Sequence, residues 1–194
     1  VKNITTAEGG AITTNNKTIH NKILSLRENG TISKFSKKNP NFYDVVSLGY
    51  NFRINEINSS LGISQIKKTK SYISKKIKLA KRYISKFKGK PVILPDFKKN
   101  FQSSWHLFIL RIDTNKIKKN KKQIVDYLMK KNIYVTTHYI PLNTFSYFKN
   151  NYKNKDFKKA KLYYDTSFSI PLYPQMTLKE QDYVCNRIIE FLEL

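Results

Sequence analysis

The stretch from residue 57 to residue 87 constrains the fold most, because its apolar side chains repeat at the spacing of one helix face. The most regular part has alternating steps of four and three residues, between Ile73, Ile77, Ala80, Ile84 and Phe87. Asn55 can cap the start of the helix, and Gly89 and Pro91 can end it. We therefore expect one long amphipathic helix, or two nearly continuous ones, that connects two structural lobes.

The segment before this helix predicts a short strand, a helix and a long loop. Residues 11–14 are partly β-branched, which favours a strand. Residues 17–28 have apolar side chains at helical spacing, with Asn16 as a candidate N-cap and Gly30 as a stop. Residues 31–44 are polar and mixed and include a proline, so we expect a loop there.

After Pro95 the pattern changes to that of a small α+β lobe. The expected elements are strands at residues 105–112, 133–140 and 167–172 and helices at residues 121–131 and 178–194. Pro171 favours an edge position for the last strand. This order predicts a compact lobe with a small sheet, in which Trp105 and His106 are packing residues of the core.

The net charge of +24 could indicate a protein that binds nucleic acid. The lysines are spread along the whole length, however, and those between residues 67 and 78 surround the apolar face of the long helix. This scatter is typical of a solvated surface. We therefore expect no specific nucleic-acid partner, and a basic nucleic-acid-binding module is the alternative from a different class.

The sequence shows no feature of a membrane or secreted protein. No apolar run approaches the roughly 18 residues of a membrane span, and no leader is visible. The single cysteine, Cys185, cannot form an internal disulfide, and no spacing of cysteine and histidine predicts a metal site. We expect a cytoplasmic protein with no metal and no membrane partner.

Lys2 lies in an unusual local sequence. It is followed by small and hydroxyl-bearing residues and then by Glu8, Gly9 and Gly10. Such a segment is typical of a tight loop, in which a lysine amine can be held partly out of water and become nucleophilic. By spacing alone, a solvated surface lysine is the more common outcome.

Four segments together resemble one family of enzymes. VKNITTAEGGAITTN, at residues 1–15, is similar to the segment that holds the cofactor lysine in sugar aminotransferases of the DegT/StrS type. Three further segments resemble other signatures of that family and follow in the family's order. They are GYNFRINEINSSLG at 49–62, HYIPL at 138–142 and SIPLYPQMT at 169–177. The resemblance implies an α/β fold, namely the C-terminal part of a fold-type I transferase that depends on pyridoxal phosphate.

The same resemblance divides the chain into two parts. Residues 1–72 would be the remainder of the large domain that binds pyridoxal phosphate, together with the start of the connecting helix. Residues 73–194 would be the small C-terminal α+β domain. Family members carry a comparable length of chain before the lysine, with most of the cofactor pocket. We therefore expect this chain alone neither to bind the cofactor well nor to catalyse the reaction.

The resemblance also implies roles for residues of the first two motifs. Lys2 would carry pyridoxal phosphate covalently and act as the general base and acid of the reaction. Asn51 matches an asparagine that reaches across a dimer interface to the cofactor phosphate of the neighbouring subunit. Arg53 could bind a phosphate of the sugar nucleotide or the carboxylate of the amino donor. A structural ion pair with Glu56 is the alternative for Arg53.

In the third motif, His138 and Tyr139 match a His-Tyr pair that borders the pocket for the sugar nucleotide, often from the partner subunit. A histidine at a strand end before a proline could equally be a half-buried packing residue. The motifs thus imply a homodimer with shared active sites, whose substrates are a nucleotide sugar and an amino acid.

The implied function is transamination of a nucleotide-linked keto-sugar, with glutamate as the expected amino donor, in bacterial surface-sugar biosynthesis. The TTAEGG and GYNFRINEI segments look most like transaminases of the pseudaminic-acid pathway, which act on a UDP-linked 4-keto-6-deoxy amino sugar. Sugar dehydratases of the same fold are an alternative, but their family pattern has histidine where this chain has Lys2. A non-catalytic structural fragment is a further alternative.

Overall fold

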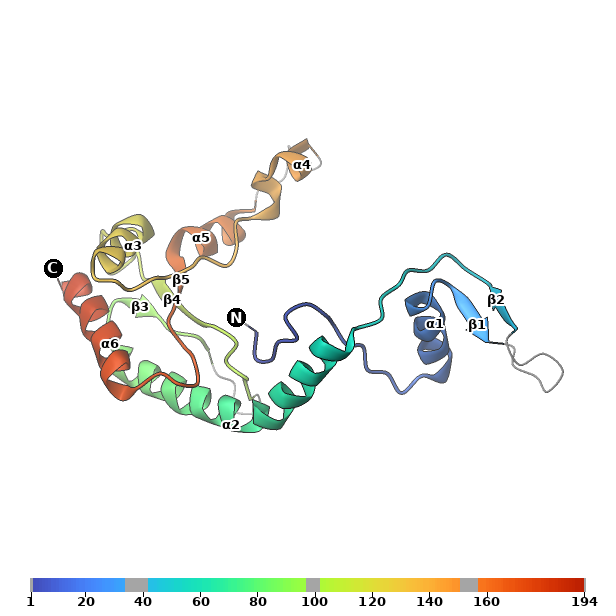
Figure 1. Cartoon of the computed structure of the whole chain (residues 1–194). Helices are drawn as coiled ribbons and strands as arrows, with labels where there is room; N and C mark the ends of the chain where they lie inside the picture. Colours follow the sequence, from blue (N-terminus) through green and yellow to red (C-terminus); the bar gives the residue numbers. More distant parts are fainter. Residues whose placement is uncertain (1, 34–41, 97–101, 151–156, 194) are drawn as a thin grey trace. The chain divides into compact units, whose positions relative to one another are not determined.

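A computed structural model describes residues 2–33, 42–96, 102–150 and 157–193 of the chain (Figure 1). The chain divides into two compact units. The first unit is Ile4–Thr69, and the second unit is Val1–Asn3 together with Lys70–Leu194. The assignment of residues 1–72 to a large domain and of residues 73–194 to a small one stays a prediction.

The predicted long helix is a single helix, α2, which runs from Glu56 to Phe87 over 32 residues. Asn55 caps it, because its Oδ1 accepts a hydrogen bond from the Asn58 backbone N–H at 2.9 Å. The boundary between the two units falls after Thr69, inside this helix. None of the described helices is both long enough and apolar enough to cross a membrane.

In the first unit, the predicted helix is α1, Lys17–Arg27. Asn16 is its N-cap, and the Asn16 Oδ1 accepts a hydrogen bond from the Ile19 backbone N–H at 3.1 Å. The helix ends where Asn29 and Gly30 adopt positive φ angles of 59° and 76°. The start and stop signals in the sequence were therefore sufficient for this element.

Two expectations for the first unit are wrong. Residues 11–14, all of them described, form no strand, and Ile12 is largely exposed because no neighbouring strand pairs with it. The expected loop at 31–44 begins and ends in strands β1, Thr31–Ser33, and β2, Tyr43–Val45, which pair antiparallel. The rest of that expected loop, residues 34–41, lies outside the described residues.

The second unit contains an antiparallel sheet in the order β3-β4-β5. Its strands are Val92–Ile93, Phe108–Ile112 and Ser167–Ile170. The expected strand at 105–112 begins three residues late, because Trp105 has a φ of 49° that strand pairing does not allow. β5 lies at an edge of the sheet, as Pro171 predicted.

The expected strand at 133–140 is wrong. Only Thr136 pairs there, through two backbone hydrogen bonds with Ser169 on β5 at 3.3 and 2.7 Å. The next antiparallel pair would join Tyr134 to Pro171, which has no N–H to donate. The ladder therefore cannot continue from Thr136 toward Tyr134.

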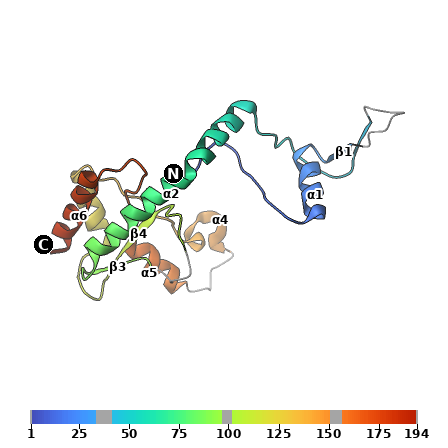
Figure 2. The same cartoon turned by 90° about the horizontal axis from the view of Figure 1, so that it is seen from below.

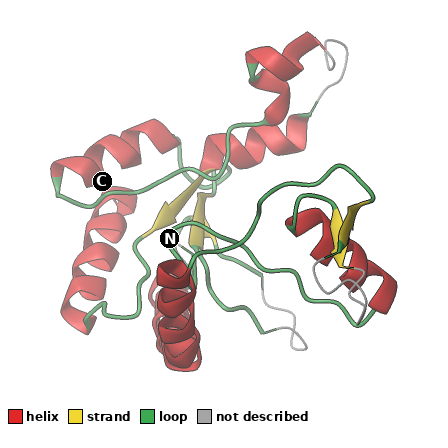
Figure 3. Ribbon diagram, turned by 45° about the vertical axis from the view of Figure 1, so that its right-hand side comes forward, coloured by secondary structure: helices red, strands yellow, loops and turns green. Residues whose placement is uncertain are grey.

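The predicted helices of the second unit are present as α3, Lys121–Lys130, and α6, Leu178–Glu193. Three short helices were not predicted, namely η1, Leu142–Thr144, α4, Ser146–Lys149, and α5, Lys158–Thr166. Figures 1 and 2 place the second part of α2 across one face of the sheet, and Figure 3 shows the strands enclosed by helices. Tyr83 on α2 packs on Phe108 of β4, with ring centroids 5.0 Å apart, in a core that excludes water.

Candidate functional site

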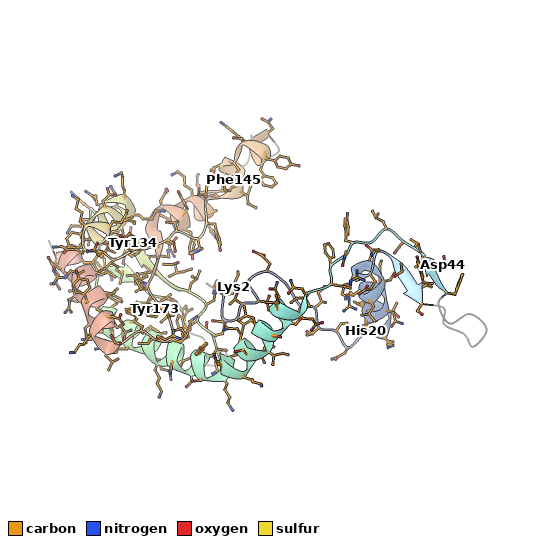
Figure 4. All side chains as sticks on the ribbon, viewed as in Figure 1. Lys2, His20, Asp44, Tyr134, Phe145 and Tyr173 are labelled. Carbon is orange, nitrogen blue, oxygen red and sulfur yellow. The ribbon has the colours of Figure 1, made fainter. Side chains whose placement is uncertain are left out.

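Lys2 is an exposed residue whose neighbour, Asn3, is held at both ends of its side-chain amide (Figure 4 labels Lys2). The Asn3 Nδ2 donates to the Ser104 Oγ at 2.8 Å. The Asn3 Oδ1 accepts from the Lys76 Nζ, also at 2.8 Å. All of these residues belong to the second unit, so the start of the chain is fixed to α2 and to the segment that leads into β4.

Lys76 is the buried member of this arrangement, with 4% of its surface exposed. Its Nζ also lies 3.5 Å from the His106 carbonyl oxygen. Among the described residues, no carboxylate is within ion-pair distance of Lys76. Burial lowers the pKa of Lys76, because the charged ammonium is removed from water.

His106 is half-buried, and its Nδ1 is shielded from solvent without a hydrogen-bond partner in the described part of the chain. Burial lowers the pKa of His106, and the positive charges of Lys2, Lys76 and His138 lower it further. The charges of three basic residues thus bear on His106, and we call Lys2, Lys76, His106 and His138 the Lys2 group.

His138 and Tyr139 differ in their surroundings. The His138 Nδ1 lies 2.9 Å from the Ser169 Oγ on β5, which anchors the ring. Tyr139 packs its ring edge-on against His138, with centroids 4.6 Å apart, and is 70% exposed. The structure thus anchors His138 to β5 and leaves Tyr139 open to a ligand.

The TTAEGG segment forms a tight turn in the first unit. The Thr6 Oγ1 donates to the Glu8 carbonyl oxygen at 2.8 Å, and the Asn58 Nδ2 donates to the same oxygen at 3.1 Å. Gly9 has a φ of +147°, and a β-carbon there would lie 2.6 Å from the Thr6 Oγ1. A β-carbon on Gly62 would approach the Thr6 Cγ2 to 2.9 Å. The first and second motifs therefore pack closely against each other.

Asn51 and Arg53 lie in the first unit, beside the end of α1. The Asn51 Oδ1 accepts a hydrogen bond from the Arg53 backbone N–H at 3.4 Å. The Arg53 Nη1 forms an ion pair with the Glu28 Oε2 at 2.7 Å, so the alternative pairing with Glu56 is wrong. The partner lies 25 residues earlier in the chain, and only the folded backbone brings it there. The Arg53 side chain is nevertheless more than half exposed.

The second unit also contains a hollow away from Lys2. It has a volume of about 590 Å³. Its lining includes Tyr134, Pro171, Tyr173, Met176 and Tyr183. None of the predicted site residues is among the residues that line it.

The Lys2 group fits the cofactor that the resemblance implies. Lys2 offers an exposed primary amine, which can condense with an aldehyde. Lys76, which is buried and donates to the Asn3 side chain, ties the segment that carries Lys2 to α2. Two of these residues, Lys76 and His106, were not predicted as site residues. Neither residue lies in one of the four motifs. No local pattern could identify them, because burial and charge coupling arise from tertiary contacts.

Comparisons with known proteins agree with the four motifs. The sequence model of the DegT/DnrJ/EryC1/StrS aminotransferase family matches residues 1–189. The UDP-4-amino-4,6-dideoxy-N-acetyl-beta-L-altrosamine transaminase of Helicobacter pylori is 32% identical over 197 residues, which are 100% of this chain and 50% of that protein. An uncharacterised protein of Methanocaldococcus jannaschii, MJ1066, is 34% identical over 91% of this chain and 47% of its own length.

Solved structures show the same relationship. PseC of Helicobacter pylori, an aminotransferase involved in the biosynthesis of pseudoaminic acid, superposes with a TM-score of 0.88 at 31% identity, over 100% of this chain and 51% of that one. The sugar aminotransferase CalS13 of Micromonospora echinospora has the same fold, with a TM-score of 0.85 at 17% identity over 98% of this chain and 49% of that one. The chain spans about half the length of the curated relatives it matches.

Proposed function

Because this chain belongs to the DegT/DnrJ/EryC1/StrS aminotransferase family, we propose that it provides the lysine-bearing half of an enzyme that aminates a nucleotide-linked keto-sugar. Enzymes of this family use pyridoxal phosphate, and their structures have the fold of type I transferases that depend on it. The observation that carries the proposal is the match of the family model to residues 1–189, whose first motif contains Lys2. The hydrogen bonds of Asn3 with Lys76 and Ser104 support it, because they tie the backbone next to Lys2 to α2 and to the segment before β4.

The substrate class is proposed from the relatives. Proteins of Helicobacter pylori and Campylobacter jejuni that are 32% identical over the whole of this chain are named UDP-4-amino-4,6-dideoxy-N-acetyl-beta-L-altrosamine transaminases. We infer that the substrate here is a UDP-linked 4-keto-6-deoxy amino sugar and that glutamate donates the amino group. This assignment places the protein in bacterial surface-sugar biosynthesis, in the cytoplasm.

Each residue of the site has a role that its surroundings support. Lys2 holds the cofactor and, through its Nζ, takes a proton from the carbon that carries the amino group and returns it. Pyridoxal phosphate, when bound, supplies the ring that accepts the electron pair released at that carbon. His106 presents a neutral ring, because burial and the neighbouring positive charges lower its pKa.

The nucleotide sugar is assigned to three exposed or half-buried side chains. Arg53 offers its guanidinium to a phosphate, and its ion pair with Glu28 fixes one side of that group while leaving more than half of it accessible. Tyr139 and His138 border the sugar, with His138 held in place by Ser169. Asn51 donates its amide to the cofactor phosphate of a second copy of the chain.

A homodimer with shared active sites is part of the proposal. The second motif and the residues around it expose many apolar side chains, namely Val45, Val46, Leu48, Tyr50, Phe52, Ile54, Ile57, Ile63 and Ile66. Such a concentration of exposed apolar residues marks a surface that binds another protein. Asn51 lies within this stretch of sequence. An asparagine that reaches into a neighbouring subunit has to lie at the interface, so this position agrees with the proposal.

The first prediction tests the function with a chimera. The corresponding half of the Helicobacter pylori transaminase is replaced by this chain, and the product is analysed by mass spectrometry after incubation with pyridoxal phosphate, a UDP-linked 4-keto-6-deoxy amino sugar and ¹⁵N-glutamate. We expect ¹⁵N in the sugar product, no product from the chain alone, and no product from the chimera with Lys2→Ala. Product formation by a folded Lys2→Ala chimera would contradict the role of Lys2.

A further inference from the structure

Six lysines lie close together in the middle of α2, and one of them differs from the rest. Lys67, Lys68, Lys70, Lys75 and Lys78 are all exposed, whereas Lys76 is buried. Lysine is rarely buried unless its ammonium has a partner, because removal of the charge from water is costly. The position of Lys76 therefore requires a compensating contact.

That contact is with the residue next to Lys2. The Lys76 Nζ donates to the Asn3 Oδ1 at 2.8 Å, and the opposite end of the same amide donates to Ser104. The Asn3 oxygen accepts one hydrogen bond and the Asn3 nitrogen donates the other. Only one orientation of the amide satisfies both. The separations along the chain are 73 and 101 residues.

We propose that Lys76 is a positioning residue for Lys2: its buried ammonium holds the Asn3 side chain, and this contact fixes the backbone from which the Lys2 side chain projects. The inference rests on the proposed role of Lys2 as the cofactor lysine. Lys76 acts through Asn3 and is not assigned a contact with the substrate.

The test compares the reactivity of Lys2 in five variants: Lys76→Met, Lys76→Arg, Asn3→Ala, the double variant of Lys76→Met with Asn3→Ala, and the matched control Lys75→Met. Each variant of this chain is built into the chimera of the first prediction, and the chimera is mixed with pyridoxal 5′-phosphate, whose aldehyde condenses with lysine amines and releases water. Borohydride then reduces each adduct to a stable secondary amine, and peptide mapping gives the labelled fraction at Lys2 relative to the exposed lysines of α2.

We expect Lys2 to be labelled preferentially in the unchanged chain. Lys76→Met should lower that preference about tenfold, the size expected for losing a hydrogen bond from a charged group. Asn3→Ala should lower the preference by a similar factor. The double variant should lose no more of the preference than the more affected single variant, because both changes remove the same contact. Lys76→Arg should restore the preference, and Lys75→Met should leave it unchanged.

A second measurement does not involve the cofactor. In an NMR spectrum that detects ¹⁵N-labelled lysine ammonium groups, the buried and hydrogen-bonded Lys76 should exchange slowly and give a signal. We expect Asn3→Ala to remove this signal and Lys75→Met to preserve it. Circular dichroism establishes that each variant is folded, and Lys76→Arg and Asn3→Ala carry the test if Lys76→Met does not fold.

The two hypotheses fail in different ways. If Lys2 is labelled no more than the exposed lysines, the proposed function fails, whereas the ammonium signal still tests the contact between Lys76 and Asn3. If Lys2 is labelled preferentially but Lys76→Met has no more effect than Lys75→Met, the positioning role of Lys76 is overturned. Loss of the Lys76 signal only in variants that also lose helical structure overturns it as well.

Discussion

Single residues decide how the end of α1 meets the second motif. Gly30 has a φ of +76°, and a β-carbon there would lie 1.7 Å from the Ser47 carbonyl oxygen. A β-carbon on Gly49 would lie 2.0 Å from the Gly30 nitrogen. The two backbones approach so closely because neither glycine has a side chain. This approach is what places Arg53 within reach of Glu28.

The second prediction follows from this contact. Gly30→Ala should destabilise the chain by roughly 2–4 kcal/mol, because it combines a strained φ with a clash against backbone. The free energy of unfolding in urea measures the effect. Gly10→Ala is the control, since its β-carbon would meet no atom within 4 Å. Equal stabilities for the two variants would show that the approach of Gly30 to Ser47 is not required.

His106 shows the limit of residue-level prediction. The sequence places it next to Trp105 and a run of apolar residues, which predicted a packing role. Trp105 is indeed buried in the core, whereas His106 is half-buried and coupled to the charges of Lys2 and Lys76. Both of those lysines are distant in sequence, so no local pattern could identify the group.

At the scale of elements, α2 and α6 are joined by a polar cluster at the edge of the core. The Arg82 Nη2 lies 2.7 Å from each carboxylate oxygen of Asp182, and the Lys86 Nζ lies 3.2 Å from one of them. The neighbouring Gln181 is buried and donates to the Leu79 carbonyl oxygen at 2.7 Å. The contact between the two helices thus combines an ion pair with a buried hydrogen bond.

The third prediction concerns the pH dependence of this contact. Hydrogen bonds from Arg82 and Lys86 hold the pKa of Asp182 below its ordinary value. The stabilisation is therefore complete above the pKa of an unfolded aspartate and is lost as the pH falls through the lowered pKa of the folded state. The urea midpoint should fall less between neutral pH and about pH 3 in Asp182→Asn than in the unchanged chain.

Asp126→Asn serves as the matched control, because Asp126 pairs with Lys122 on the exposed face of α3, away from the contact between α2 and α6. It should retain the acid sensitivity of the unchanged chain. The same pH dependence in all three proteins would mean that Asp182 does not couple α2 to α6.

Helices were more predictable than strands in this chain. Asn16, Asn55 and Asn120 each accept a backbone hydrogen bond at a helix start, and these caps depend on residues within three positions. Strands depend on partners far along the chain. Residues 133–140 have the composition of a strand, but only Thr136 pairs. Tyr134 cannot extend this pairing, because the position that faces it is Pro171.

At the scale of the whole molecule, the exposed apolar side chains of the first unit require an explanation. They extend along the sequence from β2 into α2, and Phe52 is 67% exposed. The chain also spans about half the length of its curated relatives. The exposed apolar side chains support a surface that another protein covers, and the proposed homodimer assigns it to a second copy.

The fourth prediction tests that surface. Phe52→Asp should shift the chain toward the monomer in sedimentation equilibrium, because it places a charge among apolar side chains. Met129→Asp is the control, since Met129 is also exposed but lies on α3 in the second unit. A monomeric unchanged chain at every concentration, or identical behaviour of both variants, would contradict the homodimer.

The sequence by itself determined the family, the long helix and the order of the motifs, because these depend on spacing and residue type within short segments. Lys2 was predicted in the same way, from the residues that follow it. Only the tertiary structure decided that Lys76 is buried against Asn3, that Glu28 rather than Glu56 pairs with Arg53, and that His106 belongs to the Lys2 group. Burial, ion pairing and charge coupling are set by distances between residues far apart in the chain, and those distances exist only after folding.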